Sequence, residues 1–270
     1  MHNNFKKFTL NFLEYQVKKI NSILSFPVIQ ITSKKKKILD PVTYADIEIN
    51  KIIIRYIRKN FPGHNIISEE LSDIKSLNSN YTWYIDPIDG TKNLILGLKY
   101  YSVLIGLFYK KKPIYSFIFY PALNEFYFSF QNKSFIFDSK KKTIVNFNKK
   151  KIDVSSNNKI IKIVSNSKNT LKSKKIKDFF IQKNFLFKIT GADSMNFILL
   201  AMKKIDIVIE SGLKNIDILP LMNFLKVNNI NYINWDKSKK IGKENNSLIF
   251  FNKTNENLKV VKKFLKIIKA

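Results

Sequence analysis

Four consecutive runs of aromatic and β-branched residues narrow the folds that are open to this chain. Short turns containing Lys, Asn or Pro separate the runs, and this pattern is typical of strands joined as hairpins. Strands connected so closely pair with their neighbours in an antiparallel sheet. The sequence therefore predicts an antiparallel meander formed by SVLIGLFY (102–109), PIYSFIFY (113–120), EFYFSF (125–130) and SFIFD (134–138).

Helical and strand-like segments precede this meander. Apolar residues recur every three or four positions over about 5–24 and 44–59, which predicts two helices with a lysine-rich loop between them. The second helix should end at the Pro62-Gly63 turn. Short strands are expected within 64–71 and 81–85. Residues 1–150 are therefore predicted to form an α+β half that carries the metal-binding motifs described below.

Strands and helices alternate beyond a stretch rich in Lys and Asn near 139–159. Such alternation is typical of an α/β layer, because each helix returns the chain to the next strand. We predict a second, substrate-binding half over residues 151–270, and hence a mixed α/β (α+β) fold with two subdomains. Its strands are expected at 161–165, 185–189, 205–210, 230–234 and 247–251, and its helices near 171–183, 193–204, 217–227 and 254–268.

The chain is strongly basic, with 48 Lys and Arg against 20 Asp and Glu and a formal charge of +28. Clustered cations would indicate a nucleic-acid partner, because they neutralise phosphates. However, Arg55 and Arg58 are the only arginines, and the lysines are spread along the chain. We therefore expect no specific nucleic-acid partner. A basic nucleic-acid-binding protein remains the alternative from a different functional class.

The lack of Cys and the lack of a long apolar run exclude several classes of site and of protein. The chain has no Cys, which excludes a thiolate nucleophile and a thiolate zinc site and fits a reducing compartment. It also has no apolar run of about 18 residues, so no membrane-spanning segment is expected. The N-terminal segment interrupts its apolar residues with charge and lacks the apolar core of a signal peptide. We predict a cytoplasmic protein.

Acidic residues gather at four turns of this basic chain, and we expect them to converge on one crevice. A set of oxygen ligands suits a hard cation such as Mg²⁺ better than Zn²⁺. Each turn also has a purely structural explanation: Asp46 and Asp217 could cap helices, and Glu69 could lie in a solvated turn. The clusters are Asp40 and Asp46, Glu69 and Glu70, Asp86 and Asp89, and Glu210 and Asp217.

The segment YIDPIDGTKN is the hardest of these to explain as a turn alone. Asp86 ends a predicted strand, and Asp89 returns to the same side after the bend at Pro87. Gly90 lets the backbone approach a ligand, and Thr91 stands at a predicted helix start, where N–H groups attract phosphate. Two metal ions about 4 Å apart would suit in-line displacement at phosphorus.

Taken in order, DPVTYAD, SEE, WYIDPIDGTKN and the acid-x6-Asp segment ESGLKNID resemble the motifs of the inositol monophosphatase family of Mg²⁺-dependent, lithium-sensitive phosphatases. The resemblance runs from about residue 5 to residue 268. It implies a layered αβαβα sugar-phosphatase-like fold, two or three Mg²⁺ ions, a small phosphorylated substrate and a homodimer. The metal ligands that it implies are Glu69, Asp86 as the bridging ligand, the carbonyl of Ile88, Asp89 and Asp217.

The same resemblance implies catalytic and phosphate-binding roles. Thr91, hydrogen-bonded to Asp46, would work with Glu69 to position and deprotonate a water held by the metals. The backbone amides of Gly90 and Thr91 would hold the phosphate, and no covalent phosphoenzyme is expected. All the acids that the family motif requires are present, which argues against a catalytically inactive scaffold of this fold.

Three segments resemble the histidinol-phosphate phosphatase branch of the family: VIESGLKNIDILPL, ITGADSMNFILLA and YPALNEFYF. Histidinol phosphate carries cationic groups, which Asp193 and Glu210 could neutralise. Lys92-Asn93 departs from the branch, where Arg and a small residue are more familiar. Inositol 1-phosphate and a 3'(2'),5'-bisphosphate nucleotide are the alternative substrates, since a carboxylate at position 210 could equally bind inositol hydroxyls.

Overall fold

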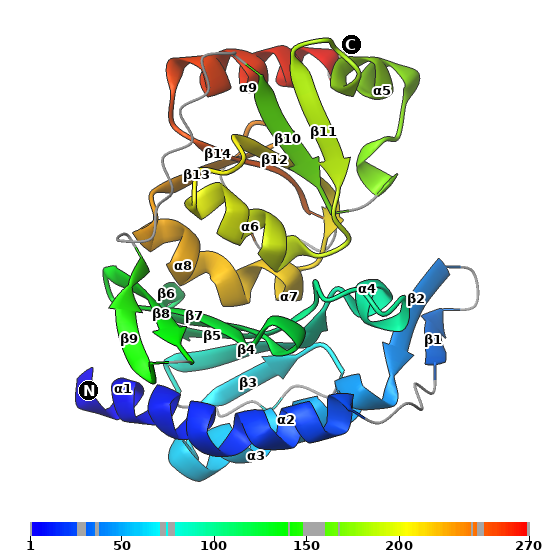
Figure 1. Cartoon of the computed structure of the whole chain (residues 1–270). Coiled ribbons are helices and arrows are strands. Elements are labelled where there is room, and N and C mark those ends of the chain that lie inside the picture. The colour runs from blue at the N-terminus through cyan, green and yellow to red at the C-terminus, as the bar shows by residue number, and fades with distance from the viewer. Residues whose placement is uncertain are drawn as a thin grey trace.

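Five layers of helices and sheets make up the molecule (Figure 1), as the predicted αβαβα arrangement requires. The computed structural model describes residues 2–25, 31–35, 38–70, 74, 79–139, 141–147, 160–166, 168–238, 240–241 and 246–268. The first helical layer confirms both predicted N-terminal helices. It consists of α1 (His2–Asn11), a π-helical segment (Phe12–Gln16), α2 (Val17–Leu24) and α3 (Tyr44–Asn60).

A seven-stranded sheet packs on this layer in the strand order β3-β4-β5-β6-β7-β8-β9. Strand β3 is parallel to β4, and every later pair is antiparallel, so the predicted meander is confirmed. Helices cover both faces of its central strands, which explains why these strands are continuous apolar runs. The bounds are β3 (Asn65–Ser68), β4 (Tyr81–Asp89), β5 (Ser102–Tyr109), β6 (Lys112–Tyr120), β7 (Glu125–Phe130), β8 (Lys133–Asp138) and β9 (Thr143–Asn146).

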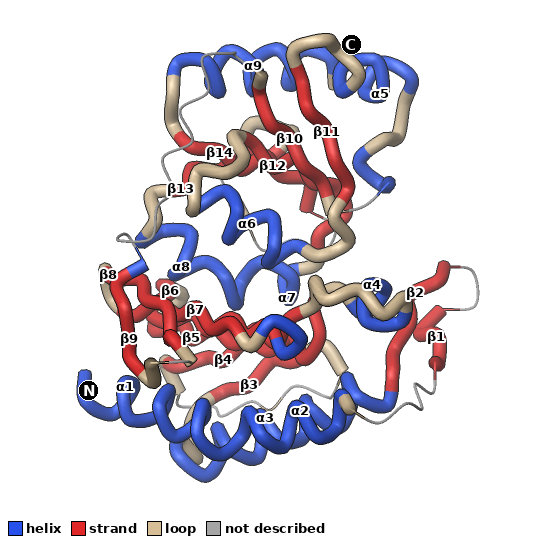
Figure 2. Tube along the Cα trace, viewed as in Figure 1, coloured by secondary structure: helices blue, strands red, loops and turns tan. Residues whose placement is uncertain are grey.

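Three strands were not predicted from the sequence. Two of them, β1 (Ile31–Lys35) and β2 (Ile38–Thr43), form an antiparallel hairpin in part of the expected lysine-rich loop, with Ile31 opposite Thr43. The third is β9, which lies in the Lys- and Asn-rich stretch. Backbone pairing with a neighbour creates these strands, and this pairing requires no alternation of apolar side chains. Figure 2 shows the hairpin beside the short helix α4 (Thr91–Ile95), close to the site described below.

A five-stranded mixed sheet forms the fourth layer, in the strand order β11-β10-β12-β14-β13. Strand β10 is parallel to β11 and β12, whereas β14 is antiparallel to both of its neighbours. Helices α5 (Lys174–Phe180) and α9 (Asn255–Ile267) cover its outer face, and α6 (Asp193–Ala201) lies on its inner face (Figure 1). The strands are β10 (Ile161–Ser165), β11 (Phe185–Ile189), β12 (Ile207–Leu213), β13 (Ile230–Asn234) and β14 (Asn246–Asn252).

The prediction of a single helix at 217–227 is wrong. The segment contains α7 (Asn215–Ile218), a 3-10 turn (Leu219–Leu221) and α8 (Met222–Val227). Pro220 explains the interruption, because it cannot donate a backbone hydrogen bond to the preceding turn. Asp217 is consequently the third residue of a short helix of its own instead of an N-cap.

A shared core joins the two sheets through α6 and α8. Leu104 and Ile118 of the first sheet belong to the same buried cluster as Phe197, Phe224 and Phe250 of the later layers. Both halves therefore contribute to one hydrophobic interior. The predicted junction near residue 150 lies within 148–159, outside the described residues, so the division at that position stays a prediction.

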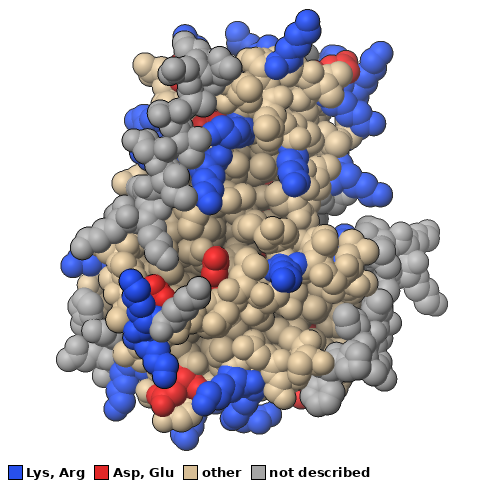
Figure 3. Space-filling view, viewed as in Figure 1, with Lys and Arg blue, Asp and Glu red and all other residues tan. Residues whose placement is uncertain are grey.

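Basic side chains are scattered over the visible face of the molecule, on both the upper and the lower layers (Figure 3). Acidic side chains are few on the same face. Among the described helices, none combines the length and the apolar character that crossing a membrane requires.

Candidate active site

A pocket of 220 Å³ lies where the middle helical layer meets the ends of strands from both sheets. Its wall is built from the end of β4, the start of α4, the residue after β10, the start of α6, and the segment that runs from β12 into α7. Three of the four predicted acidic turns contribute to it, and Asp193 joins them. The carboxylates that line the pocket are Glu69, Asp86, Asp89, Asp193, Glu210 and Asp217.

Three of these carboxylates form one tight group. Glu69, Asp86 and Asp217 each offer an oxygen within 4.8 Å of the others. Asp86 Oδ1 accepts a hydrogen bond from the backbone N–H of Ile88 at 3.1 Å, and Asp217 Oδ2 accepts one from the N–H of Lys214 at 2.7 Å. The two aspartates are thereby oriented by the backbone of their own segments.

Burial and the repulsion between neighbouring charges disfavour ionisation of the two aspartates in this group. Burial raises the pKa of Asp86 well above its ordinary value, and the nearby charge of Glu69 raises it further. The same two causes raise the pKa of Asp217 to about 7. Buried carboxylates are costly without a cation to compensate them, so their proximity calls for positive charge from outside the carboxylate group.

The donor set fits Mg²⁺. The pocket contains six carboxylates and two ammonium groups, those of Lys92 and Lys214, so full ionisation leaves four uncompensated negative charges. Two divalent cations would neutralise that charge. All the anionic donors are oxygens, which magnesium prefers. The part of the chain that the structure describes places neither Cys nor His in the pocket lining.

Asp89 lies in the same pocket but has a different environment. Its Oδ1 accepts from the backbone N–H of Asp193 at 3.0 Å, and its Oδ2 accepts from the N–H of Ser194 at 2.8 Å. Asp89 thus binds the N-terminus of α6 and is outside the three-carboxylate group. The Ser194 side chain also hydrogen-bonds to this carboxylate, which leaves at least one of its four lone pairs for a cation.

The DPIDGT turn has the geometry that its glycine suggested. Gly90 adopts φ +85°, and a Cβ at this position would lie 3.0 Å from both Ala192 Cβ and the Tyr100 carbonyl oxygen. Only glycine fits there without strain. Thr91 begins α4, and its hydroxyl oxygen lies 3.0 Å from the carbonyl oxygen of Ile88 and 3.3 Å from Asp46 Oδ1.

Asp46 occupies a position just behind the pocket. It forms a capping box with Thr43 at the start of α3, which is the structural role considered from the sequence. Its second carboxylate oxygen accepts from Thr91, so it also orients a pocket residue. The side chain of Asp40, the other acid of this turn, lies outside the described residues.

Asp193 and Glu210 are linked by Asn166. The side chain of Asn166 donates to Asp193 Oδ2 at 2.6 Å, and its backbone N–H donates to Glu210 Oε1. Glu210 also accepts from Ser165 and Asn196, and burial raises its pKa to about 8. Asp193 differs, because its Oδ1 is buried and has no hydrogen-bond partner.

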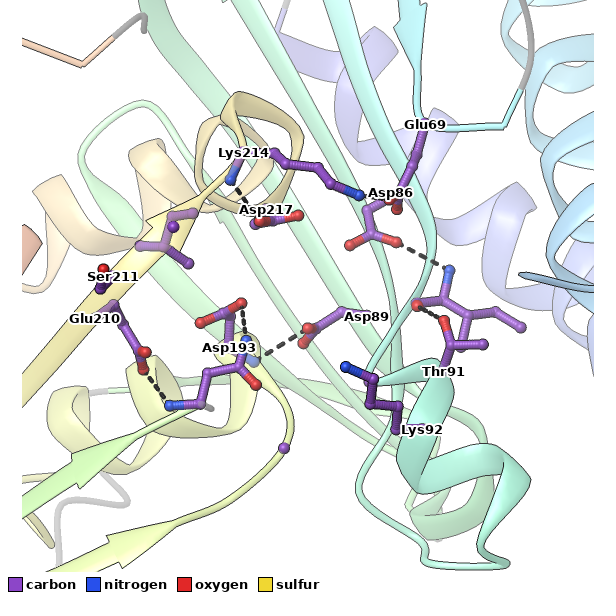
Figure 4. Close-up of a pocket in the computed structure, with 16 residues that line it drawn as sticks. Glu69, Asp86, Asp89, Thr91, Lys92, Asp193, Glu210, Ser211, Lys214 and Asp217 are labelled. Carbon is purple, nitrogen blue, oxygen red and sulfur yellow. Dashed lines mark hydrogen bonds and ion pairs between the residues drawn. The ribbon is translucent and has the colours of Figure 1, made fainter. Parts of the chain in front are cut away.

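Three pocket residues were missed by reasoning from the sequence. Lys214 reaches across the pocket to Glu69, with 2.9 Å between Nζ and Oε1 (Figure 4). Lys92 lines the pocket from α4, and Asn166 connects the two deepest acids. Lys214 lies inside the quoted ESGLKNID segment, three residues before Asp217, and this spacing was its only signal. Nothing in the sequence around Asn166 marks it.

Comparison with known proteins identifies relatives. The sequence model of the inositol monophosphatase family matches residues 11–248. The chain is 39% identical over 97 residues to Nus factor SuhB of Haemophilus influenzae, covering 36% of each protein. It is 29% identical over 185 residues to the bifunctional phosphatase IMPL2 of Arabidopsis thaliana, covering 68% of this chain and 51% of that protein. The matched segment thus spans between about a third and a half of these two relatives.

Solved structures share the fold. A staphylococcal IMPase-I complexed with products superposes with a TM-score of 0.79 at 20% identity, covering 100% of this chain and 96% of that one. An IMPase/NADP phosphatase complexed with Mg²⁺ and phosphate gives a TM-score of 0.76 at 21% identity, covering 99% and 96%. At these identities the likeness concerns the fold alone.

Proposed function

We propose that this chain, which belongs to the inositol monophosphatase family, is a Mg²⁺-dependent hydrolase of phosphate monoesters. Histidinol phosphate is the first proposed substrate, followed by inositol 1-phosphate and a 3'(2'),5'-bisphosphate nucleotide. The observation that carries the proposal of a hydrolase is the group formed by Glu69, Asp86 and Asp217, whose oxygens lie within 4.8 Å of one another in a pocket large enough for a small ester.

The proposed ligands of Mg²⁺ are the three grouped carboxylates together with Asp89 and the Ile88 carbonyl. Asp86 is central among them, because both Glu69 and Asp217 contribute to the rise of its pKa. Bound Mg²⁺ would act as a Lewis acid toward the phosphate oxygens and would lower the pKa of water.

Thr91 and Glu69 are proposed to orient and deprotonate the attacking water. The Thr91 hydroxyl can donate to Asp46 or to the Ile88 carbonyl, and its lone pairs then remain able to accept a hydrogen bond from a water molecule. Glu69 is partly exposed, whereas Asp86 is buried, and Glu69 is proposed to accept the proton of the water. The backbone amides of Gly90 and Thr91, at the start of α4, are proposed to bind the phosphate.

The environment of Asp193 favours a substrate that carries a positive charge. Asp193 lines the pocket, and its Oδ1 is a buried carboxylate oxygen without a hydrogen-bond partner, which is costly unless a ligand donates to it. The ammonium group of histidinol phosphate would supply such a donor, whereas a neutral hydroxyl would leave the charge uncompensated. Three donors already hold Glu210, so its proposed role is to fix Asn166 and, through it, Asp193.

A panel of three substrates tests both the metal-dependent hydrolysis and the choice of substrate. Phosphate release would be measured from histidinol phosphate, inositol 1-phosphate and 3'-phosphoadenosine 5'-phosphate, with Mg²⁺ and with EDTA. We expect EDTA to reduce turnover to background, and kcat/KM for histidinol phosphate to exceed the others by about tenfold or more. Turnover that persists in EDTA would exclude the metal mechanism. Equal rates on the three esters would exclude the substrate assignment.

Asp193→Asn should separate the substrates. Loss of the charge-assisted contact is expected to raise KM for histidinol phosphate about 10- to 100-fold and to change KM for inositol 1-phosphate by less than about threefold. Steady-state kinetics on both esters provides the measurement. Asp178→Asn, on the exposed surface of α5, is the matched control. A similar loss on both esters would mean that Asp193 serves only to hold α6 and Asn166.

A further inference from the structure

An ion pair couples the segment before α7 to the three-carboxylate group. Lys214 Nζ lies 2.9 Å from Glu69 Oε1, although 145 residues separate the two in the sequence. The Lys214 side chain is 43% exposed and that of Glu69 only 16%, so the ammonium group reaches inward from solvent to a more enclosed carboxylate. Figure 4 shows its side chain extended over Asp217 toward Glu69 and Asp86.

This position conflicts with a metal ion at the same carboxylate. Mg²⁺ binds carboxylate oxygens at about 2.0–2.1 Å, and an ammonium group hydrogen-bonded to the same carboxylate would lie only a few ångströms from it. Two cations so close repel strongly wherever the surroundings screen poorly. In the absence of metal the ammonium group is stabilising, because it offsets the repulsion among Glu69, Asp86 and Asp217.

We infer that Lys214 is a built-in counter-ion of the metal site: its ammonium group occupies Glu69 in the metal-free protein and must withdraw when Mg²⁺ binds there. The inference rests on the proposed metal site and assigns to Lys214 the regulation of its affinity. Lys214 would thereby stabilise the metal-free fold and weaken Mg²⁺ binding through one and the same contact.

The local geometry allows the side chain to leave without disturbing the ligands. The backbone N–H of Lys214 donates to Asp217 Oδ2, and movement of the side chain leaves that hydrogen bond in place, although the ammonium charge attracts Asp217 as well as Glu69. The lysine stem has four rotatable bonds and is already partly in solvent. Removing the charge should therefore change the affinity for metal and leave the backbone hydrogen bond to Asp217 in place.

Lys92 provides a matched control. It lines the same pocket and carries the same charge, but it enters from the first turn of α4 on another side (Figure 4). Lys92→Met removes one positive charge from the pocket without removing the contact to Glu69. A difference between Lys92→Met and Lys214→Met therefore measures that contact and not the total charge of the pocket.

The test is a calorimetric titration of EDTA-treated protein with Mg²⁺ alone, without substrate. We expect Lys214→Met to bind Mg²⁺ roughly three- to tenfold more tightly than the unaltered protein. Lys214→Arg, which retains the charge, should stay within about twofold, and Lys92→Met should change the affinity by less than Lys214→Met does. Without metal, Lys214→Met should melt about 2 °C lower, and saturating Mg²⁺ should abolish or reverse that difference.

Three outcomes would overturn the inference. Unchanged or weaker Mg²⁺ binding by Lys214→Met would show that the ammonium group orients Glu69 and does not compete with the ion. An equal gain in Lys92→Met would assign the effect to total charge. Absence of Mg²⁺ binding by the unaltered protein would reject the proposed metal site itself, and circular dichroism of each variant verifies that it is folded.

Discussion

Asp86→Asn is expected to lower kcat on the order of a thousandfold or more and, at the same time, to stabilise the metal-free protein. Asparagine retains one oxygen of the same shape, which can still accept the hydrogen bond from the Ile88 N–H. It loses the negative charge and the second anionic oxygen that we propose to hold Mg²⁺. About 4 kcal/mol of lost transition-state stabilisation corresponds to this drop in rate.

The gain in stability follows from the direction of the pKa shift. Burial, and then the charge of Glu69, raise the pKa of Asp86 in the folded protein above its unfolded value. A carboxyl group whose pKa rises on folding costs stability at pH values above its unfolded pKa, because the unfolded chain ionises more easily. Asparagine removes that cost, and we expect a gain of about 1–3 kcal/mol in the free energy of unfolding at pH 7 without metal.

Denaturant unfolding in EDTA, repeated in Mg²⁺, measures the stability effect separately from activity. The advantage of Asp86→Asn should shrink or reverse in Mg²⁺, because only the unaltered site gains stability from the ion. Glu48→Gln, at an acid on the outer helical layer paired with Lys51, is the control for loss of one negative charge. A variant that is destabilised in EDTA, or that retains near-normal kcat, would contradict the proposed role of Asp86.

Gly106→Ala is expected to lower the free energy of unfolding by about 3 kcal/mol. Gly106 lies in the middle of β5, where the sheet presses against the 3-10 turn that contains Pro220. A Cβ at this position would lie 2.9 Å from the Pro220 carbonyl oxygen and closer still to its Cα. Both partners are backbone atoms, so no side chain can rotate away to relieve the overlap.

The displacement caused by Gly106→Ala should also affect the proposed metal site. Pro220 follows Asp217 by three residues, and displacing the turn would draw Asp217 away from Glu69 and Asp86. Chemical denaturation and Mg²⁺ titration of the same variant measure the two effects. Gly63→Ala is the control, because its Cβ would meet nothing within 4 Å, and its stability should change by less than about 0.5 kcal/mol. Equal stability of Gly106→Ala and the unaltered protein would show that the two layers are not rigidly packed there.

Much of the fold was predictable because strong local patterns determine it. The α3 helix carries its own capping box in Thr43 and Asp46, and the four aromatic strands form a meander because their turns are short. The hairpin of β1 and β2 and the break at Pro220 were missed for opposite reasons. The hairpin exists through backbone pairing without a strong side-chain pattern, whereas apolar periodicity continued across a proline that interrupts the helix.

The acidic residues of the pocket were also predictable, because Asp, Pro and Gly in DPIDGT are unusual in so basic a chain. The sequence did not predict that Asp86 and Asp89 would lie in two different environments. Asp86 and Asp89 are three residues apart, yet one lies among carboxylates and the other binds the start of α6. That difference depends on where the later half of the chain lies, and no local pattern encodes it.

The sequence by itself determined most of the helices and strands of this protein and the acidic character of its pocket, since periodicity and residue type act locally. Only the tertiary structure decided which charges meet. The Lys214 ammonium group reaches Glu69 across 145 residues, and Asn166 joins Asp193 to Glu210, because packing of the two sheets brings their strand ends together. Electrostatic interactions act through space, so the pairing of charges follows from the fold and not from order along the chain.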